Sequence, residues 1–340
     1  MQPSLLARMA SVILLTILAP STPAAEDYYD IGPIHQPVTT SSEDAQTWFD
    51  RGLAMCFGFN HEEAVTCFDR ALQADPGCAM AHWGIAYAWG PNMNNMEIVS
   101  DQMAQAHHAI HLATLFKENT TPLEQDLIAA LAKRCAIPVP EDRNPLNESY
   151  AAAMKQVHAR HSDSALVATL YAESMMNLQP WAHFDREGTP AERTPEILRV
   201  LEDGLQQWPD SPSLSHLYIH MMEMSPTPEK AVLVAGRLLN AVGGSGHLIH
   251  MPSHIYMRVG DYEAVVDSNA AAIAVDDEYV KDVGPYNFYS LYRIHNYHFL
   301  VYGAMFDGQS DVALRTARAI TRQVPEDMLK EQVDFLDAFM

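Results

Sequence analysis

Apolar residues along this chain recur every three to four positions, which is the spacing of a helix with one buried face. Alternation of apolar and polar residues, the mark of a half-buried strand, does not extend over a useful length. The helical pattern covers 45–78, 81–87, 101–116, 122–134, 146–160 and 163–178. Pro-rich segments at 136–145 and 180–195 interrupt it and predict loops. The pattern therefore predicts an all-α fold.

The first helical stretch has the layout of a two-helix repeat. Small residues at Gly52 and Ala64 fall where two antiparallel helices would touch, Phe68 would fill the gap beside them, and Pro76 would end the second helix. The spacing of large residues, small residues and the helix-ending proline agrees with the 34-residue tetratricopeptide pattern. The positions that agree are Trp48, Gly52, Ala64, Phe68, Ala71 and Pro76. A second copy is marked by Gly308, Ala313, Ala317 and Pro325.

These positions resemble the tetratricopeptide repeat (TPR) family, which implies a right-handed solenoid of helical hairpins. The segments 176–181, 216–226 (HLYIHMMEMSP), 246–262 (GHLIHMPSHIYMRVGDY) and 295–300 (HNYHFL) are further similar to a group of exported bacterial TPR proteins. That group has no settled activity, so the resemblance implies a fold and motif positions but no reaction. Its members continue beyond the equivalent of residue 340, and 334–340 reads as an apolar helix without a polar cap, so we expect a truncated array.

The N-terminus is typical of a secretory signal. Arg8 precedes an apolar stretch at 9–19 that is too short to span a bilayer, and small residues at 21–25 favour cleavage near Ala25. We therefore expect a signal peptide at 1–25, an N-terminal extension at 26–44 and a repeat array at 45–340, in the periplasm or secreted. Further along, the sequence has no apolar run long enough to suggest a membrane span.

The net charge bears on which partners the chain can bind, and the cysteines bear on its disulfide bonds. The formal charge of −22 reflects 43 acidic against 21 basic residues, which disfavours binding to nucleic acid. An oxidising compartment permits disulfides among Cys56, Cys67, Cys78 and Cys135. A Cys56–Cys67 bridge across the first hairpin is the favoured pairing, and small buried thiols are the alternative.

Histidines in the last third follow the repeat. His216 and His220 lie four residues apart, and His250 and His254 repeat that pair one 34-residue period later. The same register places His298 on the next repeat. In TPR proteins these positions face the concave groove, so the resemblance implies one wall of the groove lined by histidines. The candidate metal ligands are His216, His220, Glu223, His247, His250, His254, His295 and His298.

Imidazole is the commonest transition-metal ligand, and histidines at i and i+4 can hold one ion from a single helix. A helix 8–10 Å away could supply further ligands, and Glu223 could bind the ion or orient an imidazole. The ligand types suit zinc, copper or iron. Asn296 and the tyrosines at 286, 289 and 292 are expected to orient the ligands.

Three functions remain open from the sequence: binding of a transition metal or small polar ligand in a histidine-lined groove, binding of a peptide or protein there without metal, and histidines that serve only packing. The loop at Trp181–Asp185 could cover the groove or be a plain structured loop. No phosphate-binding loop or nucleophile elbow accompanies these features. The sequence assigns no reaction.

Overall fold

The computed structural model describes residues 28–96, 98–285 and 287–323. Within those ranges the chain consists of helices and loops, without a strand, which confirms the all-α prediction. The expected signal peptide, Pro325 of the last repeat and the apolar segment 334–340 lie outside them. None of the helices in these ranges combines the length and apolarity needed to cross a bilayer.

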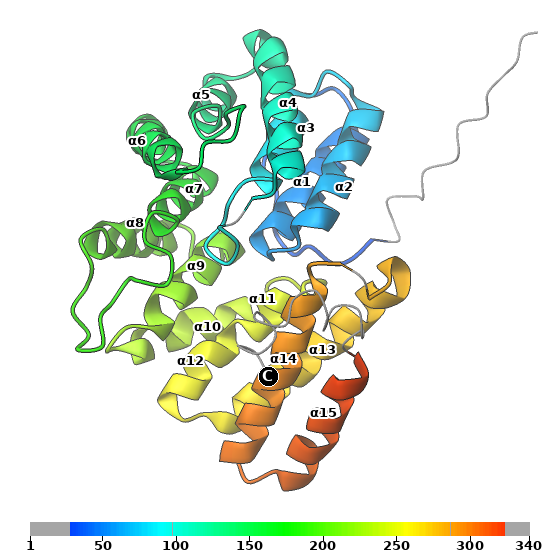
Figure 1. The fold of residues 1–340 in the computed structure, drawn as a ribbon, viewed down its shortest axis with the longest axis vertical. Helices are drawn as coiled ribbons and strands as arrows, with labels where there is room; N and C mark the ends of the chain where they lie inside the picture. Colours follow the sequence, from blue (N-terminus) through cyan, green and yellow to red (C-terminus); the bar gives the residue numbers. More distant parts are fainter. Residues whose placement is uncertain (1–27, 97, 286, 324–340) are drawn as a thin grey trace, which may run out of the picture.

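The first half of the chain forms successive antiparallel helical hairpins (Figure 1). Each hairpin packs on the next, as expected for a TPR-like array. The helices are α1 (Glu43–Phe57), α2 (His61–Ala74), α3 (Ala79–Ala88), α4 (Ser100–Phe116), α5 (Pro122–Leu131), α6 (Asn144–Arg160), α7 (Ala165–Met176) and α8 (Thr194–Gln207).

The second half continues the array with less regular hairpins. The partner of α9 is a 3-10 turn, η3, followed by a short helix, and the first helix of the next hairpin is divided at Met251. The elements are α9 (Pro212–Glu223), η3 (Pro228–Ala231), α10 (Val232–Leu238), α11 (Gly246–His250), α12 (Pro252–Val259), α13 (Tyr262–Val283), α14 (Ser290–Phe306) and α15 (Ser310–Gln323).

Close contact between hairpins depends on small residues, as the repeat pattern predicted. A Cβ added at Gly52 on α1 would lie 2.4 Å from Cε1 of Phe68 on α2, and one at Gly84 on α3 would lie 2.6 Å from the same atom. Carbon atoms cannot approach so closely, so both positions require glycine for Phe68 to fit between the helices. Phe68 is fully buried there.

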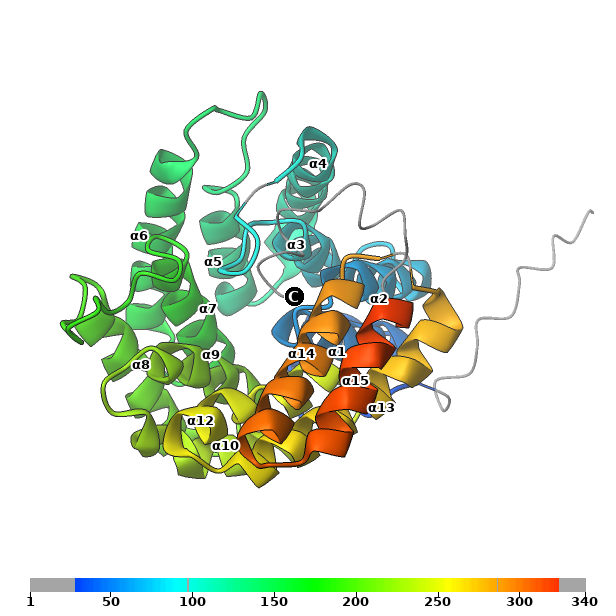
Figure 2. The same cartoon turned by 60° about the horizontal axis from the view of Figure 1, so that its bottom comes forward.

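The array curls until its first hairpin meets later ones (Figures 1 and 2). The carbonyl oxygen of Phe57, at the end of α1, accepts a hydrogen bond from His216 on α9 at 2.7 Å. Glu62 on α2 accepts one from the backbone N–H of Phe288, just before α14, at 3.0 Å. Residues more than 150 positions apart are therefore in direct contact where the array closes on itself.

Residues 28–42 cross this junction before α1 begins. The Tyr29 hydroxyl donates to Asp282 at 2.7 Å, and the carbonyl oxygen of Asp30 accepts from the N–H of Gly244 at 2.7 Å. At the other end, the N–H and hydroxyl of Thr39 donate to Glu124 on α5, at 2.7 and 2.5 Å. We call residues 28–42 the strap, because this segment connects the start of the first hairpin to α13 and the loop before α11 on one side and to α5 on the other.

The favoured Cys56–Cys67 disulfide is wrong, since all four cysteines are free thiols. Cys67 faces the strap, with its sulfur 3.0 Å from the hydroxyl of Tyr28. Cys56 instead borders a small cavity beside Glu173 and His216. The two side chains therefore point to different faces of the hairpin, and the small-buried-thiol alternative describes Cys56 and Cys67.

Candidate metal centre

Two helical segments carry the paired histidines. His216 and His220 occupy consecutive turns of α9, which Ser211 caps by accepting from the N–H of Leu214. His250 ends α11 and His254 lies in α12, but Met251 between them keeps helical dihedrals of φ −50° and ψ −39°. The break arises because Pro252 has no N–H to donate to the preceding turn. The i, i+4 geometry therefore survives it.

The first cluster, triad 1, consists of His216, His220 and His247, all buried. Their closest ring nitrogens converge: the Nε2 atoms of His216 and His220 are 3.0 Å apart, and those of His216 and His247 are 3.2 Å apart. His216 Nδ1 lies 2.7 Å from the carbonyl oxygen of Phe57, and His220 Nδ1 lies 2.7 Å from Glu223 Oε1.

The second cluster, triad 2, consists of His250, His254 and His295. The Nε2 atoms of His250 and His254 are 2.8 Å apart. His250 Nδ1 donates to Asn269 Oδ1 at 2.6 Å, and the amide nitrogen of Asn269 donates to a backbone carbonyl, which fixes that side chain's orientation. His254 Nδ1 lies 2.5 Å from Glu223 Oε2.

Both triads follow the 34-residue period seen in the sequence. Each takes an i, i+4 pair from one repeat and a third histidine from the next repeat, one turn before the pair position there. The imidazole centroids are 4.7 to 5.6 Å apart within triad 2 and 4.7 and 4.9 Å apart along the bonded pairs of triad 1. Between the triads, the centroids of His220 and His254 are 6.2 Å apart and those of His247 and His250 are 5.9 Å apart, while His220 and His247 within triad 1 are 6.4 Å apart. The six rings are therefore contiguous, and it is the ligand nitrogens that group them into two triads.

Glu223 lies between the triads and belongs to both. One carboxylate oxygen accepts from His220 of triad 1 and the other from His254 of triad 2. Burial acts to raise the pKa of Glu223, but His254 and His220 together outweigh it and hold the pKa below its usual range. The carboxylate is therefore charged and orients two imidazoles at once.

The hydrogen-bond partners decide which nitrogen of each paired ring carries the proton. Because a carbonyl, amide or carboxylate oxygen faces Nδ1 of His216, His220, His250 and His254, each Nδ1 holds a hydrogen, and in the neutral form of each ring Nε2 presents a lone pair. Two Nε2 lone pairs then face each other at 3.0 Å in triad 1 and 2.8 Å in triad 2. Facing lone pairs repel unless a cation lies between them.

A proton on His216, His247, His250 or His295 is disfavoured as that cation. Burial lowers the pKa of His216, His247 and His250 well below the usual histidine value and lowers the pKa of His295 to about 3. Neutral imidazole is the form that binds metals. Ligands about 2.0–2.1 Å from a tetrahedral zinc ion lie about 3.3 Å apart. The Nε2 atoms of two pairs in triad 1 are 3.0 and 3.2 Å apart, those of His250 and His254 in triad 2 are 2.8 Å apart, and all ligand atoms of each triad lie within 4.8 Å of one another.

The remaining predicted ligand, His298, lies outside both triads. It occupies the repeat position of His216 and His250, but the residue four further on is Tyr302, whose ring centroid is 5.7 Å away. A tyrosine that is 48% exposed replaces the second histidine of the pair. The structure also differs from the expected open groove wall, because His216, His247 and His250 are buried.

A cavity of about 280 Å³ borders both triads. His220 and His247 of triad 1 and His254 and His295 of triad 2 line it, whereas His216 and His250 lie deeper. The rest of the lining is mainly aromatic and aliphatic, with Trp181, Phe288, Leu291 and Tyr292. The Trp181 and Tyr292 rings contact those of His220 and His247. Any position left open on an ion in either triad would therefore adjoin a space large enough for a small molecule.

Asp276 on α13 supports the start of α11 from behind. It accepts hydrogen bonds from the hydroxyl of Tyr289 at 3.0 Å and the amide of Asn296 at 2.7 Å, and that hydroxyl accepts from the N–H of His247 at 3.0 Å. Burial raises the pKa of Asp276 from 3.8 to about 7, although both hydrogen bonds and Arg293 act to lower it. Tyr289 and Asn296 thus support the site indirectly.

This raised pKa predicts a pH-dependent stability. Between about pH 4 and pH 7 the folded state holds a proton that the unfolded state has lost, so the free energy of unfolding falls as the pH rises through that window. Asp276→Asn keeps an acceptor for Tyr289 without a buried charge. We expect it to gain on the order of 1–3 kcal/mol over the native chain at pH 8 and little at pH 4, by urea unfolding.

The exposed Asp267, on the same helix, provides the control for this measurement. Asp267→Asn should leave the pH profile of unfolding unchanged. An Asp276→Asn chain with the native profile would contradict the raised pKa.

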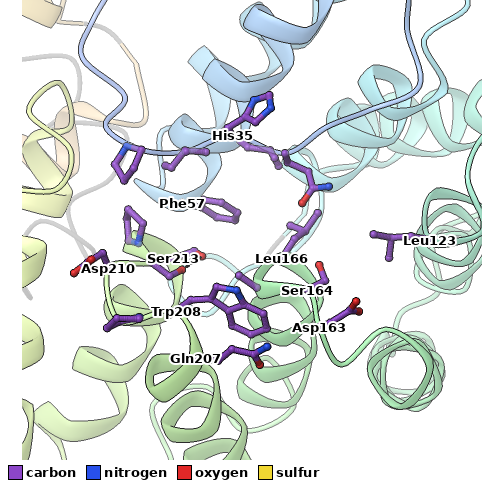
Figure 3. Close-up of a pocket in the computed structure, with 18 residues that line it drawn as sticks. His35, Phe57, Leu123, Asp163, Ser164, Leu166, Gln207, Trp208, Asp210 and Ser213 are labelled. Atoms are coloured by element: carbon purple, nitrogen blue, oxygen red, sulfur yellow. Dashed lines mark hydrogen bonds between the residues drawn. The ribbon is translucent and has the colours of Figure 1, made fainter.

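A larger cavity of about 670 Å³ lies apart from the histidines (Figure 3). Phe57, Leu166, Trp208 and the strap residue His35 border it, together with Asp163. It shares none of its lining residues with the smaller cavity. Among the described residues, those that line it include no histidine triad of the kind found at the smaller cavity.

Sequence reasoning missed some contributors to the site. Asn94 lies in the loop after α3, and the Phe59 ring lies 4.6 Å from that of His216, centroid to centroid. Neither residue has a local signal, because both reach the site only through the curl of the array. The loop at Trp181–Asp185, for which the sequence left a cover over the groove and a plain structured loop as alternatives, contributes Trp181 to the cavity wall.

No protein-family model and no curated protein matches this chain. Among solved structures it is similar to the human IFIT1 dimer with PPP-AAAA, at 14% identity and a TM-score of 0.39, over 82% of this chain and 73% of that one. The human IFIT1 dimer with m7Gppp-AAAA is similar at 14% identity and a TM-score of 0.40, over 82% and 72%. At these TM-scores the likeness carries no argument, so the assignment of a TPR-like helical array rests on the hairpins themselves.

Proposed function

We propose that this protein binds two transition-metal ions, one in each histidine triad, and that it does so outside the cytoplasm, as its N-terminal segment predicts. The observation that carries the proposal is the convergence of Nε2 lone pairs whose tautomers are fixed by Phe57, Asn269 and Glu223. Packing alone does not require two acceptor nitrogens to face each other in a dry interior.

The donor set bears on which ion is bound. Three neutral imidazoles suit zinc, copper and iron, and a fourth position facing the cavity would leave room for water or a ligand. The excess of negative charge on the chain favours cations generally. Zinc is the simplest probe, because it is redox-inert and accepts the tetrahedral geometry that these spacings match.

The test is the metal content of the mature protein, purified without an affinity tag or added metal, measured by plasma mass spectrometry. We expect about two equivalents of transition metal, and their loss in the double variant His220→Ala/His254→Ala. The exposed His111 provides the matched control, since His111→Ala should retain both ions.

A native chain that holds no metal and takes up no zinc, copper or iron would overturn the proposal. Two functions would then remain: binding of a peptide or protein segment, for which the cavity of about 670 Å³ beside Trp208 offers room, and histidines that serve only packing.

A further inference from the structure

The smaller cavity is walled by two kinds of surface. Imidazole rings from both triads line it, together with the aromatic and aliphatic side chains of Trp181, Phe288, Leu291 and Tyr292. A volume of about 280 Å³ corresponds to roughly nine water molecules at liquid density. A ligand that fills it has on the order of nine non-hydrogen atoms, and rings are the shape that such walls favour.

Trp181 borders the cavity in an unfavourable backbone conformation. Its φ of +58° lies in the left-handed region, which costs a side chain of this size roughly 1 kcal/mol or more. The indole meets His220 edge-on, with centroids 5.6 Å apart and planes at 90°, and it remains 47% exposed. Because the ring borders both the cavity and solvent, the strained turn positions it as the outer wall.

Asn94 adds a polar requirement. Its side chain lines the cavity and hydrogen-bonds the hydroxyl of Tyr292, whereas its Oδ1 atom is buried without a hydrogen-bond partner among the described residues. A buried acceptor left unpaired costs about 1–3 kcal/mol, which a ligand hydroxyl would recover. The cavity therefore offers aromatic walls, an unpaired buried acceptor on Asn94 beside the already bonded carboxylate of Glu223, and the open side of the proposed metal sites.

We propose that this cavity binds a small phenol, a single aromatic ring with a hydroxyl group, between Trp181 and the metal-bearing histidines. The ring lies against the aromatic wall and the hydroxyl donates to Asn94. The proposal rests on the proposed metal function for one of its walls, and it assigns the class of ligand without assigning a reaction.

The test uses the full zinc-loaded protein, its zinc content measured on the same sample, and calorimetric titration with phenol and with toluene. We expect one phenol per chain, bound at least tenfold more tightly than toluene. Trp181→Ala should weaken phenol binding about tenfold, and Asn94→Ala should reduce the preference for phenol over toluene at least threefold.

Phe116 supplies the matched control, because it is a partly exposed aromatic residue on α4 outside the cavity. Phe116→Ala should bind phenol like the native chain. Two retained zinc ions with no phenol binding, with equal binding of toluene, or with undiminished binding by Trp181→Ala would overturn the phenol site and leave the metal function standing. If the chain takes up no zinc when zinc is supplied, but still binds phenol in a way that depends on Trp181, the metal function alone is refuted.

Discussion

Replacing Glu223 by glutamine weakens zinc binding at both triads in one step, by about 10- to 100-fold at each. The carboxylate accepts from Nδ1 of His220 with one oxygen and from Nδ1 of His254 with the other. A glutamine amide has one oxygen, so its NH₂ group must face one of the two Nδ1–H groups. That ring then has to change tautomer or turn, and its Nε2 lone pair is lost to the ion.

The expected signature is therefore unequal damage. One triad loses only the negative charge that polarised its imidazole, and the other also loses ligand geometry. Competition with a chromophoric chelator separates the two steps. Glu202 is an exposed carboxylate on α8 that hydrogen-bonds Tyr218, so Glu202→Gln serves as the control and should bind zinc normally. Two unchanged affinities in Glu223→Gln would show that the carboxylate does not support the ions.

His216 and His250, the two triad histidines that do not line the cavity, should each be needed for one ion. We expect His216→Gln to hold one equivalent of zinc in place of two, with more than 100-fold weaker binding at triad 1 and little change at triad 2. His250→Gln should show the reverse. Glutamine can still donate to Phe57 O or Asn269 Oδ1. The fold is thereby preserved while the aromatic nitrogen ligand is removed.

His298→Gln is the matched control, since it changes the same repeat position on the next hairpin but lies outside the triads. It should retain two equivalents. Loss of both ions from either single variant would mean that the triads form one joint site, and circular dichroism of each variant would show whether the helices remain intact.

The hairpins could be predicted because their signal is local. Gly52, Phe68 and Pro76 lie within one repeat, and the predicted helices at 101–116 and 146–160 correspond to α4 and α6 within a few residues. The paired histidines could be predicted for the same reason, since a fixed period transfers a position from one repeat to the next.

What the sequence could not provide depends on the curl of the array. Phe57 fixes the tautomer of His216 from 159 residues away, and no periodicity connects them. The failed Cys56–Cys67 prediction has a similar cause, because two residues on facing helices can still turn to opposite faces. His298 was included by register, but register does not show that the i+4 residue is Tyr302.

The strap and the closure of the first hairpin onto α9 and α14 change how this chain should unfold. An open repeat array frays from its ends, because each hairpin is held by its neighbours alone. Here the terminal hairpin is also fastened to partners such as Gly244 and Phe288, more than 200 residues away. Unfolding of the first hairpin breaks those distant hydrogen bonds together, so we expect one cooperative transition rather than stepwise loss of repeats.

Such long-range contacts also make folding slow, since large loops must close before the first hairpin can dock on α9 and α14.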